Sequence, residues 1–130
     1  MRDYCFNLIL ISSLNDWWDM YTQVVRGPRW ELFGRNRDAY ADSLSGGPGC
    51  PDRPCRFIFT HVSALCGERV LQITRDELTR KRSDCHSSHV PNIDAQLLLL
   101  KCGIGETLLT WILQPLYGQD DIDVYLKAGA

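Results

Sequence analysis

The chain has 130 residues, of which 45% are hydrophobic and 23% are charged, and this balance is typical of a folded globular protein. A chain of this length can bury one hydrophobic core without help from metals or disulfides, so we expect a single domain over residues 1–130. The formal net charge of -2 gives no general attraction to polyanions. We therefore expect no nucleic acid and no membrane among its partners.

The N-terminal segment, MRDYCFNLILISS, is the place where a targeting signal would lie. It has a short apolar run, but it also carries Asp3 and lacks a small-residue cleavage site, so it is a poor secretory signal. No apolar run in the chain reaches the roughly 18 residues of a membrane-spanning helix. We therefore expect a cytoplasmic protein. Its six cysteines are an even number, which in a secreted chain would suggest three bridges; without a signal peptide, buried free thiols are the favoured interpretation.

The first two predicted elements are a strand and a helix. Residues 5–11 (CFNLILI) are almost continuously apolar and few in number, which is typical of a buried strand in a parallel sheet. Ser12 and Ser13 are N-cap candidates for a helix in which large apolar residues recur three and four positions apart. This helix should end at Gly27-Pro28, where glycine allows a left-handed cap and proline cannot continue the helix.

A short helix and a second strand are predicted next. Asn36 is a good N-cap for a helix from about Arg37 to Leu44. The glycine- and proline-rich segment 46–55 (GGPGCPDRPC) indicates a loop. It leads to CRFIFT, a strand pattern from Cys55 to Thr60.

The rest of the chain predicts three helices before a final strand. A T-x-x-E pattern at Thr74 and Glu77 has the form of a capping box, which would open a charged helix that runs to about Arg82. Another helix should begin after Asn92. The last one lies in ETLLTWILQPLYG and should end or kink at Pro115.

The segment 122–126 (IDVYL) alternates apolar and polar residues, as a strand with one buried face does. Three predicted strands separated by helices indicate an α/β fold, with a small three-stranded parallel sheet and helical crossovers in two or three layers.

A possible metal site is the C-H-x-x-H cluster formed by Cys85, His86 and His89. A structural zinc ion needs four ligands, and the fourth would have to come from a distant residue such as Cys66 or Cys102. Ordinary loop histidines are the favoured interpretation, so we expect no metal and no other cofactor.

Enzyme activity would need a nucleophile and a base in a recognisable context. His61 follows the second strand at its carboxyl end, where α/β sites commonly lie. The chain has no nucleophile elbow, no papain-like motif and no phosphate-binding glycine loop. We expect a protein that is not an enzyme; a zinc or hydrolytic enzyme that uses His61, His86 and His89 is the competing hypothesis.

Two aspartates, Asp38 and Asp42, stand one turn apart on one face of the predicted helix 37–44. Like charges at this spacing repel by roughly 0.2–0.5 kcal/mol. Asp38 in the first turn regains some of this from the helix dipole, whereas Asp42 in a later turn does not. A solvated helix face explains the pair; the alternative is a face presented to a cationic partner.

The run from Phe33 to Leu44, FGRNRDAYADSL, resembles the signature of the barstar-type ribonuclease inhibitors. That signature is an aromatic residue, Gly-x-Asn-x-Asp-Ala, a hydrophobic residue, another residue and Asp-x-Leu, and the run matches it position by position. The resemblance implies a barstar-like fold, with the strands and helices of the first 60 residues in the expected places. The region 61–105 is longer than in the compact members of the family.

In this family the helix after Gly-x-Asn and the loop before it plug the active-site cleft of a small secreted ribonuclease, where acidic side chains replace the RNA phosphates. The resemblance assigns the principal contact to Asp42 and the second acidic contact to Asp38. The other partner-binding positions that it implies are Leu32, Phe33, Asn36, Ala41, Ser45 and Gly46.

We therefore expect a cofactor-free monomer that acts as an immunity or antitoxin protein. Its partner would be a protein, a cognate toxin enzyme whose active site it blocks, with a small extracellular-type ribonuclease as the first candidate. The alternative is a barstar-like interaction module whose partner is not a ribonuclease. Because three arginines balance three acidic residues in the segment 29–45, long-range attraction to a basic partner should be weak.

Overall fold

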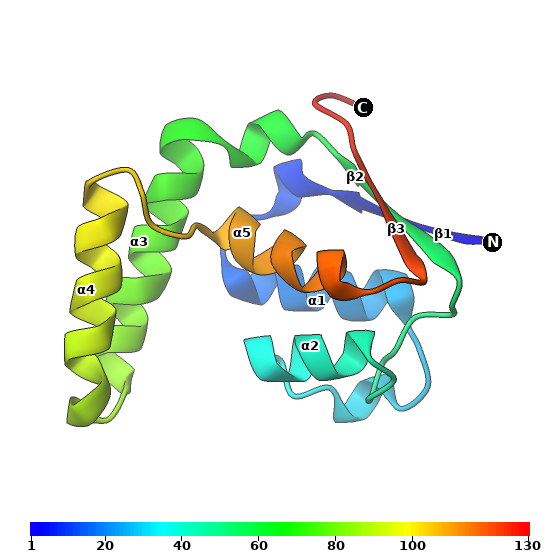
Figure 1. Cartoon of the computed structure of the whole chain (residues 1–130), viewed down its shortest axis with the longest axis horizontal. Coiled ribbons are helices and arrows are strands. Elements are labelled where there is room, and N and C mark those ends of the chain that lie inside the picture. Colours follow the sequence, from blue (N-terminus) through cyan, green and yellow to red (C-terminus); the bar gives the residue numbers. More distant parts are fainter.

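The computed structural model of the chain describes residues 1–130 (Figure 1). The strands are β1 (Arg2–Asn7), β2 (Cys55–Thr60) and β3 (Ile122–Leu126). The α-helices are α1 (Leu14–Val25), α2 (Arg37–Leu44), α3 (Gly67–Asp84), α4 (Val90–Lys101) and α5 (Leu108–Leu113). Short 3-10 turns lie at η1 (Leu8–Leu10), η2 (Trp30–Leu32), η3 (Val62–Leu65), η4 (Ser87–His89) and η5 (Gln114–Gly118).

The three strands form one parallel sheet in the order β1-β2-β3, so that β2 is central. In the register of the sheet, Tyr4 lies beside Phe57 and Phe57 lies beside Val124. Helices α1 and α2 connect β1 to β2, and α3, α4 and α5 connect β2 to β3. The predicted α/β class, with a small parallel sheet and helical crossovers, is confirmed.

Only one face of the sheet is covered by helices, so the fold has two layers. Tyr4 and Phe6 of β1 are buried, whereas Cys5 between them is exposed. Helices α1, α2 and α5 gather on the buried side of the sheet (Figure 1). Trp17 of α1 packs on Phe6, with ring centroids 5.1 Å apart, and on Tyr40 of α2 at 5.7 Å.

The first strand lies earlier in the chain than predicted. It ends at Asn7, whose side chain accepts a hydrogen bond from the backbone N–H of Ile9 (3.1 Å) and so starts a 3-10 turn. This local bond replaces the sheet ladder that the apolar run 5–11 suggested. Ile9 and Leu10 are consequently exposed after the turn.

Helix α1 begins as predicted, because the Ser13 hydroxyl accepts from the backbone N–H of Asp16 (3.1 Å). Its left-handed cap is Arg26, with φ 47°, and not the glycine that the sequence favours. Gly27 has a different role: a Cβ there would lie 1.9 Å from the carbonyl oxygen of Cys50. Glycine at this position lets the loop before β2 pack against the end of α1.

Helix α3 begins at Gly67, so Thr74 and Glu77 lie inside the helix and do not form its capping box. The Thr74 hydroxyl donates to the Val70 carbonyl (2.6 Å) and accepts from the backbone N–H of Leu108 (2.8 Å). A Glu77 carboxylate oxygen accepts from the backbone N–H of Leu14 (2.8 Å). Both side chains therefore satisfy the first residues of other helices. A true capping box lies at Thr107, the N-cap of α5.

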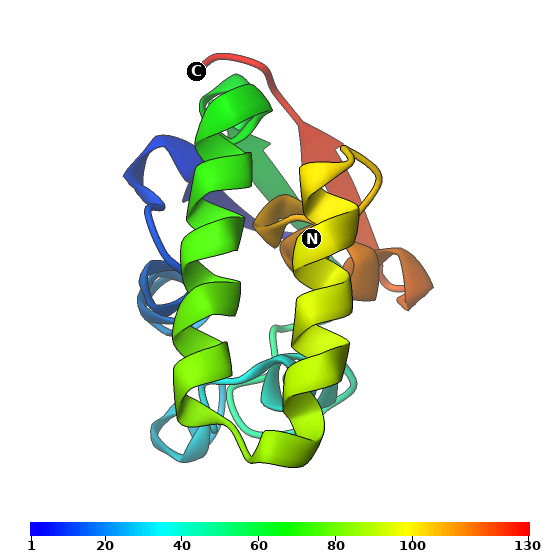
Figure 2. The same cartoon turned by 90° about the vertical axis from the view of Figure 1, so that its left-hand side faces the viewer.

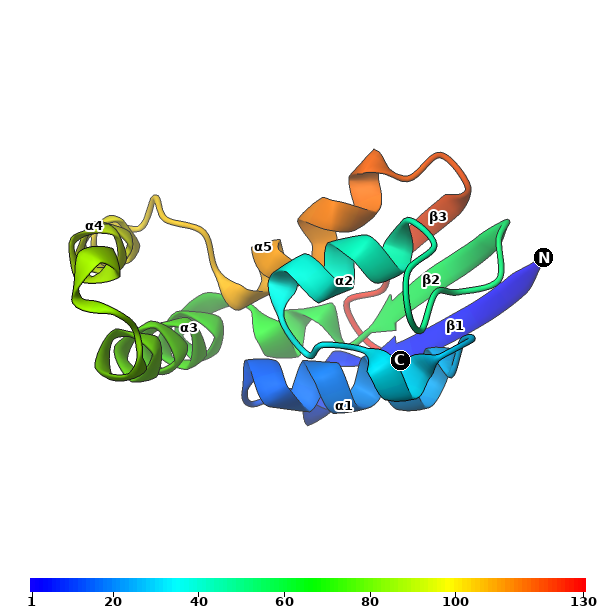
Figure 3. The same ribbon diagram turned by 90° about the horizontal axis from the view of Figure 1, so that it is seen from below.

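Helices α3 and α4 form an antiparallel hairpin that stands beside the rest of the molecule (Figures 2 and 3). Leu78, Ile93 and Leu100 are buried between them and the core. Arg82 of α3 pairs with Asp94 of α4 at 2.7 Å. Helix α4 starts slightly earlier than predicted, with a proline in its first turn, where no N–H partner is needed.

The prediction of six buried free thiols is correct for only one cysteine. None of the six is in a disulfide, but Cys55 alone is buried, because its side chain points from the central strand toward the helices. The exposed thiols are Cys5, Cys66 and Cys102, and the intermediate ones are Cys50 and Cys85. No helix combines the length and the hydropathy that crossing a membrane would require.

Candidate functional site

Helix α2 lies with one face in the core and the opposite face in solvent. The Asn36 side chain caps it by accepting from the backbone N–H of Ala39 (2.7 Å). The inner face is fixed by two buried hydroxyl contacts: Tyr40 donates to the Ile112 carbonyl (2.7 Å), and the hydroxyls of Tyr21 and Ser43 lie 2.9 Å apart. The exposed positions of the helix and its C-cap are Arg37, Asp38, Ala41, Asp42 and Ser45.

Burial of both tyrosines makes this inner face resistant to ionisation. Desolvation raises the pKa of Tyr40, which has no contact with water. Desolvation also raises the pKa of Tyr21, although its hydrogen bond with Ser43 opposes the change. Helix α2 is thus held on the sheet by neutral hydrogen bonds and aromatic packing, which presents its outer face on a fixed support.

Asp38 and Asp42 on that outer face have no hydrogen bond or ion pair with any other side chain of the protein. Like-charge repulsion between them is therefore uncompensated within the chain. By contrast, Asp3 is paired with Arg56 (2.6 Å) and Asp94 is paired with Arg82. The acidic pair on α2 is available for an external cation.

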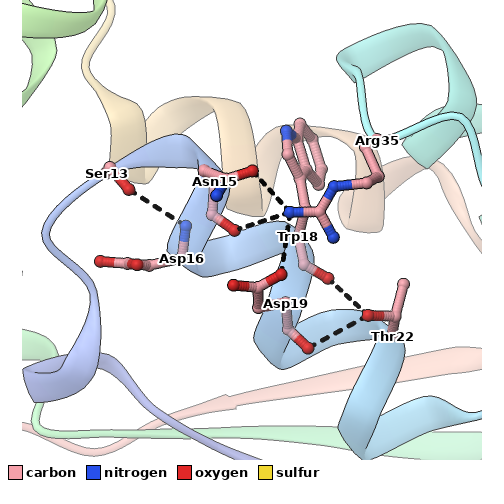
Figure 4. Close-up of polar contacts among 7 residues, drawn as sticks. All are labelled: Ser13, Asn15, Asp16, Trp18, Asp19, Thr22 and Arg35. Carbon is pink, nitrogen blue, oxygen red and sulfur yellow. Dashed lines mark hydrogen bonds and ion pairs between the residues drawn. The ribbon is translucent and has the colours of Figure 1, made fainter.

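Two of the three arginines in the segment 29–45, Arg35 and Arg37, form ion pairs with residues outside that segment. The Arg35 guanidinium lies 2.8 Å from the Asp19 carboxylate and also reaches Asn15, both on α1 (Figure 4). Arg37 stacks on Trp111, with its guanidinium carbon 5.0 Å from the ring centroid, and lies 3.8 Å from Glu106.

This arrangement changes the electrostatic expectation drawn from the sequence. The segment 29–45 is neutral by count, but the charges of Arg35 and Arg37 are balanced by Asp19 and Glu106, which lie outside it. The charges left without such partners in the segment are Arg29, Glu31, Asp38 and Asp42. The outer face of α2 therefore has an excess of negative charge.

The C-terminal end of α2 is held by the following loop, which is tied in turn to Gln119, just after η5. The backbone N–H groups of Ser45 and Gly47 both donate to the Asp42 carbonyl (3.0 and 2.8 Å). Arg53 donates to the Leu44 carbonyl and to Gln119. These contacts satisfy carbonyls that the end of a helix leaves open.

Close packing also fixes the backbone beside the Asp42 carboxylate. Gly46 has φ 110°, a conformation suited to glycine. A Cβ on Gly47 would lie 3.0 Å from an Asp42 carboxylate oxygen. The small residues after α2 therefore leave this carboxylate uncovered.

The remaining implied contact residues divide into exposed and buried ones. Leu32, in η2, is 67% exposed and is free to meet a partner. Phe33 is only 7% exposed, because its ring packs on Trp18 and Tyr21 with centroids 5.8 and 5.5 Å apart. The Phe33 ring therefore positions the loop before α2 and offers little surface to a partner. Asn36 likewise acts through its cap.

A groove of about 980 Å³ lies between α2 and the α3–α4 hairpin. Its α2 wall includes Asp38 and Ala41, so it is continuous with the acidic face. Its opposite wall consists of residues from the second half of α3 and from α4, in the region 61–105. Sequence reasoning missed this groove because no motif links segments so far apart in the chain.

The three histidines lie in two places: His86 and His89 lie between α3 and α4, with ring centroids 6.5 Å apart, and His61 follows β2. His86 is exposed, and its ring lies 2.9 Å from the Ser88 hydroxyl at the start of η4. Nowhere in the chain do three or more His, Cys, Asp or Glu side chains group in a way that could hold a metal ion. His61 has φ 54° and a buried Nδ1 with no hydrogen-bond partner, at the turn after β2.

No protein-family model matches the sequence, and no curated protein matches it either. The functional interpretation therefore depends on the residues themselves: the motif 33–44 and the acidic face that α2 presents.

Proposed function

We propose that the protein is an inhibitor of the immunity or antitoxin type. It inserts the outer face of α2 into the active-site cleft of a cognate toxin enzyme, and the first candidate for that enzyme is a small extracellular-type ribonuclease. The observation that carries the proposal is the pair of carboxylates, Asp38 and Asp42, which have no partner within the chain. The resemblance of residues 33–44 to the barstar signature supports the same helix and the same face.

Inhibition by this face is steric and electrostatic. Asp42, with Asp38, accepts charge-assisted hydrogen bonds from the cationic side chains with which a ribonuclease binds phosphate. The exposed Leu32 and the glycine at position 46 extend the contact on either side of α2. Because α2 is fixed by Tyr40 and by the contacts at its C-terminal end, little conformational entropy is lost on binding. Neither a cofactor nor a second copy of the chain is needed, and the inhibitor would act in the cytoplasm.

Ribonuclease inhibition by the purified protein tests the proposal. Hydrolysis of a fluorogenic RNA substrate by a small basic secreted ribonuclease should fall to zero as the protein approaches a one-to-one ratio. The variants Asp38→Ala and Asp42→Ala should need a large excess. Asp76→Ala, which removes an exposed carboxylate on α3, is the matched control and should inhibit as the unmodified chain does. Full ribonuclease activity at a tenfold excess of protein would argue against this target class.

The second candidate function is the same module directed at a protein that is not a ribonuclease. Two observations favour it: Ala41 provides only a methyl group at the centre of the face, and the α3–α4 hairpin stands beside α2 as a second wall. Affinity capture with the unmodified chain and with Asp42→Ala as paired baits distinguishes the two functions. The partner is the protein retained by the first bait and lost with the second, and its activity decides between them.

A further inference from the structure

We propose that the groove between α2 and the α3–α4 hairpin binds a cationic loop or strand of the partner protein, one that carries an arginine or a lysine. This inference depends on the proposed function, because the same partner covers the outer face of α2. It assigns a recognition role to the second half of α3, a part of the chain that lies outside the barstar-like motif.

The volume and lining of the groove suit a protruding peptide segment. Its volume of about 980 Å³ lies at the upper end of the roughly 300–1,000 Å³ range of ligand pockets. Its apolar lining includes the largely buried Trp18, Leu78 and Trp111, and the Arg37 guanidinium lies over the Trp111 ring. A lining that mixes apolar and polar groups is suited to an aliphatic side-chain stem that ends in a charge.

Most charges along the groove are already paired within the protein. Arg35 pairs with Asp19, Arg37 pairs with Glu106, and Arg80 pairs with Glu77. These pairs balance three of the four cationic side chains in the lining, so that Lys81 is left.

The charges that remain unpaired stand on opposite walls. Asp38 on α2 and Asp84 on α3 each lack a hydrogen bond or ion pair, and Lys81 is the single unpaired cation. Two carboxylates against one ammonium group favour a cationic occupant that lies between the walls.

The position of Asp84 in its helix supports the same conclusion. It is the last residue of α3, where the helix dipole is negative and a carboxylate is unfavourable. Lys81 and Arg82 in the same turn have the favourable sign, but neither forms an ion pair with Asp84. A cation supplied by a partner would relieve this unfavourable placement, as it would for Asp42 in a later turn of α2.

The groove can be tested without the natural partner by a capped Gly-Arg-Gly-Arg-Gly peptide, with a Gly-Glu-Gly-Glu-Gly peptide as its counterpart. The side-chain amides of Asn15, Asn36 and Gln96 line the groove and report binding in two-dimensional NMR spectra. The arginine peptide should shift these three amides in a saturable way, and the glutamate peptide should not.

Charge variants then assign the binding to the groove walls. Asp84→Lys should raise the Kd of the arginine peptide at least about fivefold, because the attraction between position 84 and the peptide becomes a repulsion of similar size. Asp76→Lys makes the same charge change on α3 outside the groove and should bind as the unmodified chain does. Lys81→Ala should strengthen binding.

Three results would overturn the inference: equal affinity of the Asp84→Lys and Asp76→Lys variants, similar shifts with the glutamate peptide, or no shift at millimolar peptide. Failure of the proposed function is a separate result, seen as an Asp42→Ala variant that binds the partner normally. If the chain binds the arginine peptide in the groove but inhibits no ribonuclease, the proposal for the groove stands and only the ribonuclease target is rejected.

Discussion

The Arg35 guanidinium lies 2.8 Å from the carboxylate of Asp19, across the gap between the loop before α2 and helix α1 (Figure 4). This ion pair holds the loop onto α1 and balances the charge of Arg35 with a carboxylate outside the segment 29–45. The residue that appears in the sequence to cancel the acidic face therefore contributes to its support. It does so with a left-handed backbone, φ 54°, which a non-glycine residue adopts at a cost.

The contribution of the Arg35 side chain can be separated from that of its backbone by two substitutions. Arg35→Ala loses the ion pair and retains the unfavourable φ, whereas Arg35→Gly loses the pair and relieves the backbone. We expect the glycine variant to be the more stable of the two by about 0.5–1 kcal/mol, as measured by urea unfolding. An alanine variant as stable as the glycine variant would mean that the left-handed backbone at this position costs nothing.

The hydroxyl of Thr74 is expected to be essential for the docking of α5 on α3. Thr74→Val keeps the shape of the side chain but leaves the buried N–H of Leu108 without an acceptor, at a cost of about 1–3 kcal/mol in the free energy of unfolding. Thr74→Ser keeps the hydroxyl and is the control, with a smaller loss. Calorimetric or urea unfolding of the two variants measures the difference, and equal stabilities would contradict this role.

Asp42 should lower the stability of the free protein. Asp42→Asn removes the repulsion with Asp38 and an unfavourable interaction with the helix dipole, and no ion pair is lost. The variant should be more stable by roughly 0.3–1 kcal/mol at low salt, with a smaller gain at high salt. A clear loss of stability in urea unfolding at low salt would show that Asp42 has a structural role in the chain.

The thiols should fall into reactivity classes. The exposed Cys5, Cys66 and Cys102 should react with a maleimide at pH 7.5 within minutes, whereas Cys55 should react only after unfolding. Burial raises the pKa of the Cys55 thiol to about 11, so the folded protein holds the proton more tightly than the unfolded chain does. This contribution to stability is present below about pH 8.5, the value of an unperturbed thiol, and decreases as the pH rises toward 11. Mass spectrometry of the labelled protein tests the order, and early modification of Cys55 would contradict it.

Elements with local signals were predicted well, and those that depend on distant contacts were not. Helix α2 has the predicted bounds because Asn36 caps it through a contact three residues away. Strand β2 also has its predicted bounds. In contrast, the polar residues Thr74 and Glu77 bind Leu108 and Leu14 across the fold, and sequence reasoning took them for a local cap. The N-cap of α3 is in fact Cys66, eight residues before Thr74.

The features of the candidate site also divide into those with a local sequence signal and those that depend on distant contacts. The exposure of Asp38 and Asp42 on one helix face follows from their spacing and from the apolar residues opposite them. The pairing of Arg35 and Arg37 could not be predicted, because their partners Asp19 and Glu106 lie on α1 and in the loop before α5. The same applies to the groove, whose walls are brought together only in the fold.

The affinity of the partner for the Asp42→Ala variant is the most direct test of the proposed binding face. Loss of this carboxylate from a buried contact with a cation should cost at least about 2 kcal/mol, or roughly a 30-fold higher Kd, in titration calorimetry at matched salt. Asp76→Ala removes an exposed carboxylate from another helix, α3, and should leave the Kd unchanged. An Asp42→Ala variant that binds the partner as tightly as the unmodified chain would contradict the assignment of α2 as the inhibitory face.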